Sequence, residues 1–148
     1  WSPVQTIGST LLSIQSLMNS APIHNEPGFE DRHQHGEKSK HYNQYIRHET
    51  IRVAVLEIVH IAMKKSNDEG KNKHYLLPLK LAETISDSFL DIAEIVKYIC
   101  DEYSFLDGRE FKSPYTSNGK GTIFGFSELK LRIEELEKEV FKRQNEVK

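Results

Sequence analysis

A seven-residue repeat of apolar side chains is the feature that most constrains how this chain folds. The repeat comprises Ala82, Ile85, Phe89, Ile92, Val96, Ile99 and Tyr103. Steps of three and four residues place such side chains on one face of an α-helix, so the repeat predicts a helix over 78–104. Pro78 suits the first turn, where a backbone N–H would have no partner. We expect the apolar face to pack in a core, and a groove for a partner is the alternative.

Three further segments have helical spacing, at about 4–20, 40–64 and 127–145. The first carries Val4, Ile7, Leu11, Ile14 and Met18, and the last carries Leu129, Ile133, Leu136 and Val140. The second half of 40–64 is apolar nearly all round, which predicts a helix buried on several sides. Its β-branched run at 51–55 is also compatible with a strand. Ser127 is expected to cap the last helix.

Polar and turn-forming residues separate these segments. Residues 30–40 contain no aliphatic side chain, residues 66–74 are hydrophilic, and residues 107–125 are rich in Gly, Ser, Pro and Asn. All three stretches predict surface loops. The tetrapeptide Glu26-Pro27-Gly28-Phe29 predicts a type II turn, because proline presets one central φ and glycine tolerates the other. The residues themselves therefore predict a mostly α-helical chain.

Composition narrows the class of protein. Hydrophobic residues make up 37% of the 148 residues, below the about 45 to 50%, glycine included, of globular chains, so the core is expected to be thin or shared. Twenty Lys and Arg against 22 Asp and Glu leave a net charge of −2, which argues against a nucleic-acid partner. The apolar runs are too short to predict a membrane span. The single cysteine, Cys100, allows no internal disulfide and fits a reducing compartment.

No catalytic or metal constellation is visible in the residues. The chain has seven histidines, and His33, His35, His41 and His48 are the nearest to a cluster. They lack cysteine partners and the spacing of a zinc site, so we expect solvated histidines and no metal. Cys100 has no basic neighbour in sequence, which favours a buried inert thiol over a nucleophile.

Several segments resemble the ubiquitin-conjugating enzymes. WSPVQTIGSTLLSIQSLMNSAP at 1–22 is similar to the family's Trp-Ser-Pro segment and the helix after it. HNEPGFE at 24–30 and HYNQYIRHETIRVAV at 41–55 resemble the Z type of the family. The giant inhibitor-of-apoptosis hybrid has a loop similar to NEPGFE, but IRHETIRVAV favours the Z type. SFLD at 88–91 and GTIFGFSEL at 121–129 resemble the C-terminal extension of that type.

The resemblance implies a longer parent with an α+β ubiquitin-conjugating fold. This chain would be its mostly α-helical C-terminal half, with about four helices and without the β-meander. Residues 1–65 would complete the ubiquitin-conjugating domain, 66–77 would be a polar linker, and 78–148 a helical C-terminal extension. The family's catalytic cysteine precedes the Trp-Ser-Pro segment, upstream of Trp1. We therefore expect a piece of a longer protein that is inactive by itself.

The implied activity is acyl transfer. An activating enzyme would pass ubiquitin or a ubiquitin-like protein to the upstream cysteine as a thioester, and a substrate lysine would then attack it. Glu26 aligns with an acidic gate position of the family, and the alternative is the first position of a turn. Ser2, Pro3 and Val4 match the loop that contacts ubiquitin ligases, and Ser2 and Pro3 also suit a helix cap and first helical residue.

The resemblance also implies which other molecules take part. The partners would be ubiquitin or a ubiquitin-like protein, the activating enzyme and a ligase, with no nucleic acid and no membrane. No cofactor is expected, because ATP is used by the activating enzyme. The location would be the cytoplasm and nucleus. The alternative function is a non-catalytic ubiquitin-conjugating variant, or the giant inhibitor-of-apoptosis hybrid, acting as a protein-binding module. The sequence upstream of Trp1 would distinguish these possibilities.

Overall fold

The computed structural model describes residues 6–16, 19, 20, 22–25, 27, 36–65, 77–111 and 121–146. The chain forms two compact units, Trp1–Ile46 and Arg47–Lys148. The boundary between them lies within a helix and not at the predicted linker, of which only Leu77 is described. The division into 1–65, 66–77 and 78–148 is a family-level prediction and stays one.

The first unit begins with helix α1, Ile7–Ser16. The Thr6 N–H donates to Ser9 Oγ at 2.9 Å and the Ser9 N–H donates to Thr6 Oγ1 at 3.1 Å, which satisfies two backbone donors reciprocally. The helix expected over 4–20 is therefore shorter and begins after Thr6. Its apolar side chains, expected to face a core, are exposed at Ile7, Leu11, Leu12 and Ile14.

A short 3₁₀-helix, η1, Pro22–Asn25, follows, and helix α2 runs from Glu37 to Glu49. The predicted loop over 30–40 was too long, because its last four residues are helical. Acidic Glu37 in the first turn complements the positive end of the helix dipole. Of the predicted turn at 26–29 only Pro27 is described.

The chain continues from α2 into a π-helix, η2, Thr50–Glu57, and then into helix α3, Ile58–Lys65. The helix predicted over 40–64 is confirmed, and a strand at 51–55 is excluded. The expected burial of its second half on several sides was wrong, because Val53, Ile58 and Ile61 are exposed. Ile51 and Leu56 are both buried although they are five residues apart. In a π-helix the backbone hydrogen bonds join residues i and i+5, so positions five apart lie on the same side of the helix. In an α-helix the same two positions would point in different directions.

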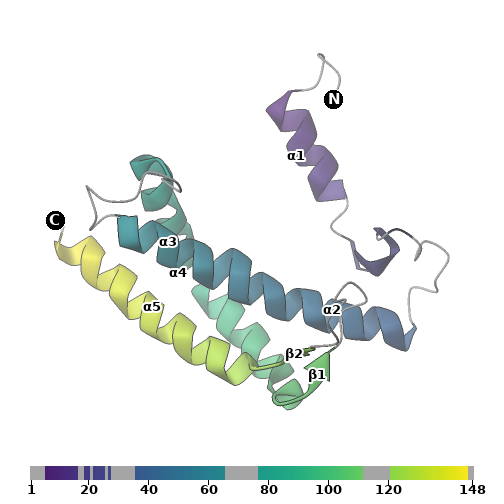
Figure 1. Cartoon of the computed structure of the whole chain (residues 1–148). Coiled ribbons are helices and arrows are strands. Elements are labelled where there is room, and N and C mark those ends of the chain that lie inside the picture. The colour runs from purple at the N-terminus through teal and green to yellow at the C-terminus, as the bar shows by residue number, and fades with distance from the viewer. Residues whose placement is uncertain are drawn as a thin grey trace. The chain divides into compact units, whose positions relative to one another are not determined.

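The rest of the second unit is two long helices and a small sheet (Figure 1). Helix α4 runs over Leu79–Tyr103, followed by the 3₁₀-helix η3, Ser104–Leu106, and helix α5 runs over Phe126–Glu146. The helices predicted at 78–104 and 127–145 are thus confirmed. Among the residues that the structure describes, α-helices and helical turns dominate, as predicted.

The stretch 107–125, expected to be loop alone, contains a two-stranded antiparallel sheet. Strand β1 is Glu110–Phe111 and β2 is Thr122–Ile123, with Glu110 opposite Ile123 and Phe111 opposite Thr122. Gly108 makes the turn into β1 with a φ of 78°, which glycine adopts without a Cβ clash. Gly108 N–H donates to the Phe124 carbonyl at 2.9 Å, which extends the pairing.

Asp107 caps α5, the role that the sequence predicted for Ser127. Asp107 Oδ1 accepts the Phe126 N–H at 2.6 Å and Oδ2 accepts the Ser127 N–H at 3.1 Å. The carboxylate thus accepts hydrogen bonds from two backbone N–H groups that have no partner within the helix, and it lies at the positive end of the helix dipole. Ser127 lies inside the helix, so the prediction of its cap role was wrong.

Helices α4 and α5 pack antiparallel. Three side-chain pairs connect them in order, Asp87 with Gln144 at 2.6 Å, Lys97 with Glu137 at 2.9 Å and Asp101 with Lys130 at 2.7 Å. Between these helices and η2–α3 lies the core. It contains Leu56, Val59, Ala62, Met63, Phe89, Ala93, Val96, Cys100, Phe126, Leu129, Ile133, Leu136 and Val140.

Only part of the apolar repeat on α4 enters this core. Ala82, Phe89 and Val96 are buried, whereas Ile92 is exposed. The predicted face of α4 is therefore split between the core and the surface. In the parts of the chain that are described, no helix is long and apolar enough to cross a membrane.

Candidate functional site

The four residues predicted to act in catalysis or ligase contact are Ser2, Pro3, Val4 and Glu26. All four lie outside the residues that the structure describes. Their roles stay predictions. The described residues on either side of Glu26 are Asn25, the last residue of η1, and the exposed Pro27.

The segment that leads to position 26 is anchored within the first unit. Ile23 of η1 is buried. The Asn43 side-chain amide on α2 donates to the Ser20 carbonyl at 2.8 Å, and the amides of Asn19 and Asn25 are joined at 3.4 Å. The Ser20 carbonyl is thus held by a residue 23 positions later in the chain.

In the second unit the structure buries a histidine that the sequence placed in solvent. His48 is 4% exposed and lies edge-on against Phe124 and Phe126, at ring-centre distances of 5.5 and 5.1 Å. Its Nε2 accepts the Gly125 N–H at 3.3 Å. Since that nitrogen accepts, the neutral ring carries its proton on Nδ1 and donates it to Glu49 Oε1 at 2.9 Å.

Glu49 links this histidine to Arg52. Arg52 Nη2 donates to Glu49 Oε2 at 2.6 Å and Arg52 Nε donates at 3.1 Å. Burial acts to raise the pKa of the Glu49 carboxyl, but the hydrogen bonds from Arg52 and His48 and the charge of Arg52 outweigh it, so the pKa lies below the ordinary value. Glu49 is therefore a carboxylate at neutral pH, and it holds the His48 ring in place.

One residue earlier, a second contact connects α2 to the end of α4. Arg47 Nη1 donates to Tyr103 Oη, and its guanidinium lies 4.5 Å from the centre of that ring. Tyr103 in turn packs on Phe126, 5.7 Å between ring centres. The RHET and GTIFGF segments, both of which carried the family resemblance, thus meet in one buried cluster. No nucleophile or open cavity accompanies it among the described residues, and its role is to join the helices.

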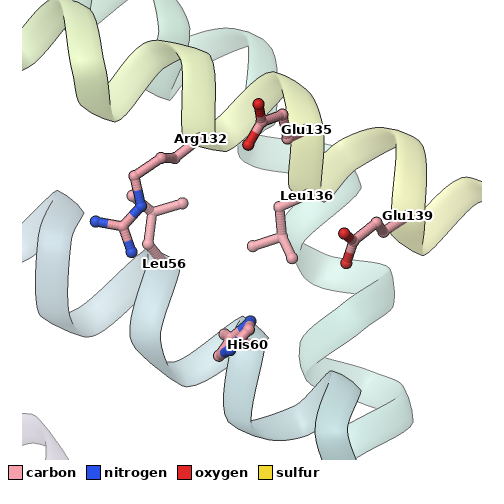
Figure 2. Close-up of a pocket in the computed structure, with 6 residues that line it drawn as sticks. All are labelled: Leu56, His60, Arg132, Glu135, Leu136 and Glu139. Atoms are coloured by element: carbon pink, nitrogen blue, oxygen red, sulfur yellow. The ribbon is translucent and has the colours of Figure 1, made fainter.

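One pocket opens between η2–α3 and α5, with a volume of about 190 Å³ (Figure 2). It is lined by Leu56, His60, Arg132, Glu135, Leu136 and Glu139. Leu56 and Leu136 are buried, whereas the other four side chains are exposed. Figure 2 shows His60 and Leu136 directed toward the space between the helices. An apolar base with a charged rim fits a small side chain of a partner better than a reaction centre.

Cys100 has the properties of a structural residue. It is fully buried on α4. Burial, together with the nearby Asp101 carboxylate, raises the pKa of the thiol to about 11. At neutral pH the sulfur is protonated and inaccessible. In the described parts of the chain no group of three His, Cys, Asp or Glu side chains is arranged to hold a metal ion.

Comparison with known proteins identifies relatives of the chain. Ubiquitin-conjugating enzyme E2 Z of Xenopus tropicalis is 37% identical over 140 residues, which are 95% of this chain and 40% of that protein. The Homo sapiens protein of the same name is 38% identical over 97% of this chain and 36% of its own length. That of Danio rerio is 42% identical over 78% and 31%. No family model matches the chain.

Proposed function

Because this chain is related over nearly its whole length to ubiquitin-conjugating enzymes of the Z type, we propose that it is the helical C-terminal part of such an enzyme. The identity of 37 to 38% over 95 to 97% of the chain carries this proposal. The chain spans only 36 to 40% of the length of those two relatives. The reaction is therefore assigned to the parent and not to this chain alone.

The parent's reaction is the transfer of ubiquitin, or a ubiquitin-like protein, to a substrate lysine. A cysteine upstream of Trp1 first accepts the modifier from the activating enzyme as a thioester. The lysine nitrogen then attacks the thioester carbonyl carbon, the C–S bond breaks, and an isopeptide bond forms while the amine proton passes to a base. Covalent catalysis divides the acyl transfer into two easier steps. The burial and raised pKa of Cys100 support a nucleophile elsewhere in the parent.

Glu26 is the candidate gate for the attacking lysine. A lysine is cationic at neutral pH, so a carboxylate beside its path attracts it, orients it and assists loss of the proton. The resemblance of HNEPGFE at 24–30 to the family's gate loop carries this role. The preceding described segment is held by burial of Ile23 and by the bond from Asn43 to Ser20.

Ser2, Pro3 and Val4 are the candidate ligase contact. The match of these three residues to the family's ligase-contacting loop supports this role. The partners proposed for the parent are the activating enzyme, the modifier and a ubiquitin ligase.

The gate is tested in the full-length parent by measuring the two steps separately. Glu26→Ala should leave thioester formation with the activating enzyme and ATP nearly intact. Discharge of the thioester onto free lysine should slow about 10- to 100-fold, at the lower end of what a positioned acid or base contributes. A second variant, Gly28→Val, should also slow discharge, because it strains the turn expected after position 26 without changing the carboxylate.

The two steps also separate the gate from the enzyme assignment. Normal single-turnover discharge by Glu26→Ala would remove Glu26 from the site and leave the acyl transfer intact. If the parent forms no thioester at all under these conditions, the assignment of an acyl-transfer activity is wrong and a non-catalytic binding role is supported.

A further inference from the structure

The pocket between η2–α3 and α5 has ionisable side chains on its rim that make no contact of their own. Arg132, Glu135 and Glu139 belong to α5, and His60 belongs to α3. All four are exposed, and none forms an ion pair or a hydrogen bond with another described residue. By contrast, α5 forms ion pairs on the side that faces α4. The rim of the pocket is therefore free to bind a ligand.

The floor of the pocket is apolar. Leu56 of η2 and Leu136 of α5 form it, and both are buried. Figure 2 shows Leu136 and His60 directed toward the open space from opposite elements. The volume of about 190 Å³ is below the about 300 to 1,000 Å³ of pockets that bind drug-sized molecules. The pocket therefore suits a single aliphatic side chain.

The charges on the rim follow one another along α5. Glu135 and Glu139 are four residues apart, so they lie on the same side of the helix and repel each other unless a cation is bound. Arg132 precedes Glu139 by seven positions, which is about 10 Å along a helix that rises 1.5 Å per residue. Figure 2 shows Arg132 and Glu139 on opposite sides of Leu136. The rim thus has a positive and a negative end with apolar surface between them.

We propose that this pocket binds a short extended peptide segment of a partner protein, in which an aliphatic residue and a lysine or arginine are separated by one residue. Side chains two positions apart on an extended peptide point to the same side. The aliphatic side chain packs on Leu56 and Leu136, and the cation lies beside Glu135 and Glu139. About three residues, at 3.3 Å each, span the distance from Arg132 to Glu139.

The balance of charge on the rim selects a basic segment over an acidic one. Two carboxylates face one guanidinium, and a bound cation removes the repulsion between Glu135 and Glu139. Arg132 repels a cation at its own end and can donate hydrogen bonds to a peptide carbonyl, which fixes the direction of the segment. None of these residues is among those proposed for acyl transfer. The pocket is therefore an additional recognition site, and its failure would leave the proposed reaction untouched.

The first experiment titrates the whole chain with three tripeptides and follows the backbone amide signals by NMR. The chain carries Ile7→Gln, Leu11→Gln and Ile14→Gln for solubility, and none of these residues lines the pocket. Acetyl-Leu-Ala-Lys-amide should shift the signals of the pocket residues saturably, with an affinity near the millimolar range expected of so small a ligand. Acetyl-Ser-Ala-Lys-amide and acetyl-Leu-Ala-Glu-amide should bind at least about fivefold more weakly, because each lacks one of the two matched groups. Shifts that do not saturate, that lie away from the pocket or that are equal for all three peptides would overturn the proposal.

The second experiment reverses one charge of the rim. Glu139→Lys should weaken binding of acetyl-Leu-Ala-Lys-amide at least about tenfold and make acetyl-Leu-Ala-Glu-amide the tighter ligand, because the end of the pocket becomes positive. The matched control is Glu102→Lys on α4, which makes the same change of net charge at an exposed glutamate that does not line the pocket. The control should keep the preference for the lysine peptide. An unchanged preference in Glu139→Lys, or an equal loss in Glu102→Lys, would show that the rim does not select the ligand.

Discussion

The pKa of Glu49 is set by the residues that pack around it. Its pKa is lowered, although burial acts in the opposite direction, because Arg52 and His48 donate hydrogen bonds to the ionised carboxylate. These contacts favour the charged form of Glu49, which directly follows His48 and lies three positions before Arg52. The consequence is a dependence of stability on pH.

Acid should therefore weaken the second unit through Glu49. A carboxyl whose pKa is lower in the folded than in the unfolded state contributes stability that is present above its ordinary pKa of 4.5 and is lost as pH falls through the folded value. We expect Glu49→Gln to reduce the acid dependence of the free energy of unfolding below that pH. Urea titrations of both proteins at several pH values measure it. Identical acid slopes would show that Glu49 is not coupled to folding.

His48 is expected to contribute more to stability than the other histidine of α2. His48→Leu removes the acceptor of the Gly125 N–H and the donor to Glu49, and such unpaired buried groups cost about 1 to 3 kcal/mol. His41→Leu is the control, because the side chain is 61% exposed and lies 3.9 Å from Glu37. Its effect should remain within about 0.5 kcal/mol. Chemical denaturation compares the two, and equal losses would contradict the buried role.

Cys100 should not react as a nucleophile. With activating enzyme, ATP and ubiquitin, the isolated chain is expected to form no thioester, because the thiol is buried and its pKa is raised to about 11. Non-reducing electrophoresis detects any adduct, and Cys100→Ser identifies it. A reducible ubiquitin adduct that disappears in Cys100→Ser would place the active site at this residue and refute our assignment.

At the scale of elements, α5 is held in place by a residue that precedes the β1–β2 sheet. Asp107 accepts both the Phe126 and the Ser127 N–H groups. The turn at Gly108 and the pairing of Gly108 with Phe124 bring the carboxylate to the start of the helix. The small sheet therefore has a structural role, because it positions Asp107 as the cap of α5.

Removing this cap should destabilise the second unit measurably. Asp107→Ala leaves two N–H groups at the helix end unsatisfied and is expected to cost about 1 kcal/mol, within the range of known caps. Asp101→Ala is the matched control, because its carboxylate makes only an exposed ion pair with Lys130, and exposed ion pairs contribute little to stability. Thermal unfolding followed by circular dichroism measures both. A smaller loss for Asp107→Ala than for Asp101→Ala would argue against the cap.

At the scale of the whole molecule, exposed apolar surface is expected to dominate behaviour in solution. Ile7, Leu11 and Ile14 on α1 are exposed, so the isolated chain should be predominantly helical but poorly soluble. Replacing these three residues with glutamine should raise the solubility without lowering the helical signal, because none of them is packed. Circular dichroism and light scattering test this. A chain that is monomeric, cooperative and of high melting temperature before any replacement would contradict it.

The sequence predicted the positions of all four helical segments, because the recurrence of apolar residues every three or four positions is a local property. It also predicted the family, through strings such as IRHETIRVAV at 46–55, and the relatives confirm that prediction. The proposed site at Glu26 follows from the same resemblance. Neither the composition nor the periodicity indicates it.

Which face of each element is buried was decided only by the tertiary structure. The apolar repeat of α4 did not reveal that Phe89 enters the core while Ile92 remains exposed, and a polar context did not reveal that His48 is buried. The cap from Asp107 and the pairing of Glu110 with Ile123 were likewise invisible. Each depends on atoms that are distant along the chain and close in space. Local pattern determines whether a helix forms, whereas burial, protonation and capping depend on what packs against it.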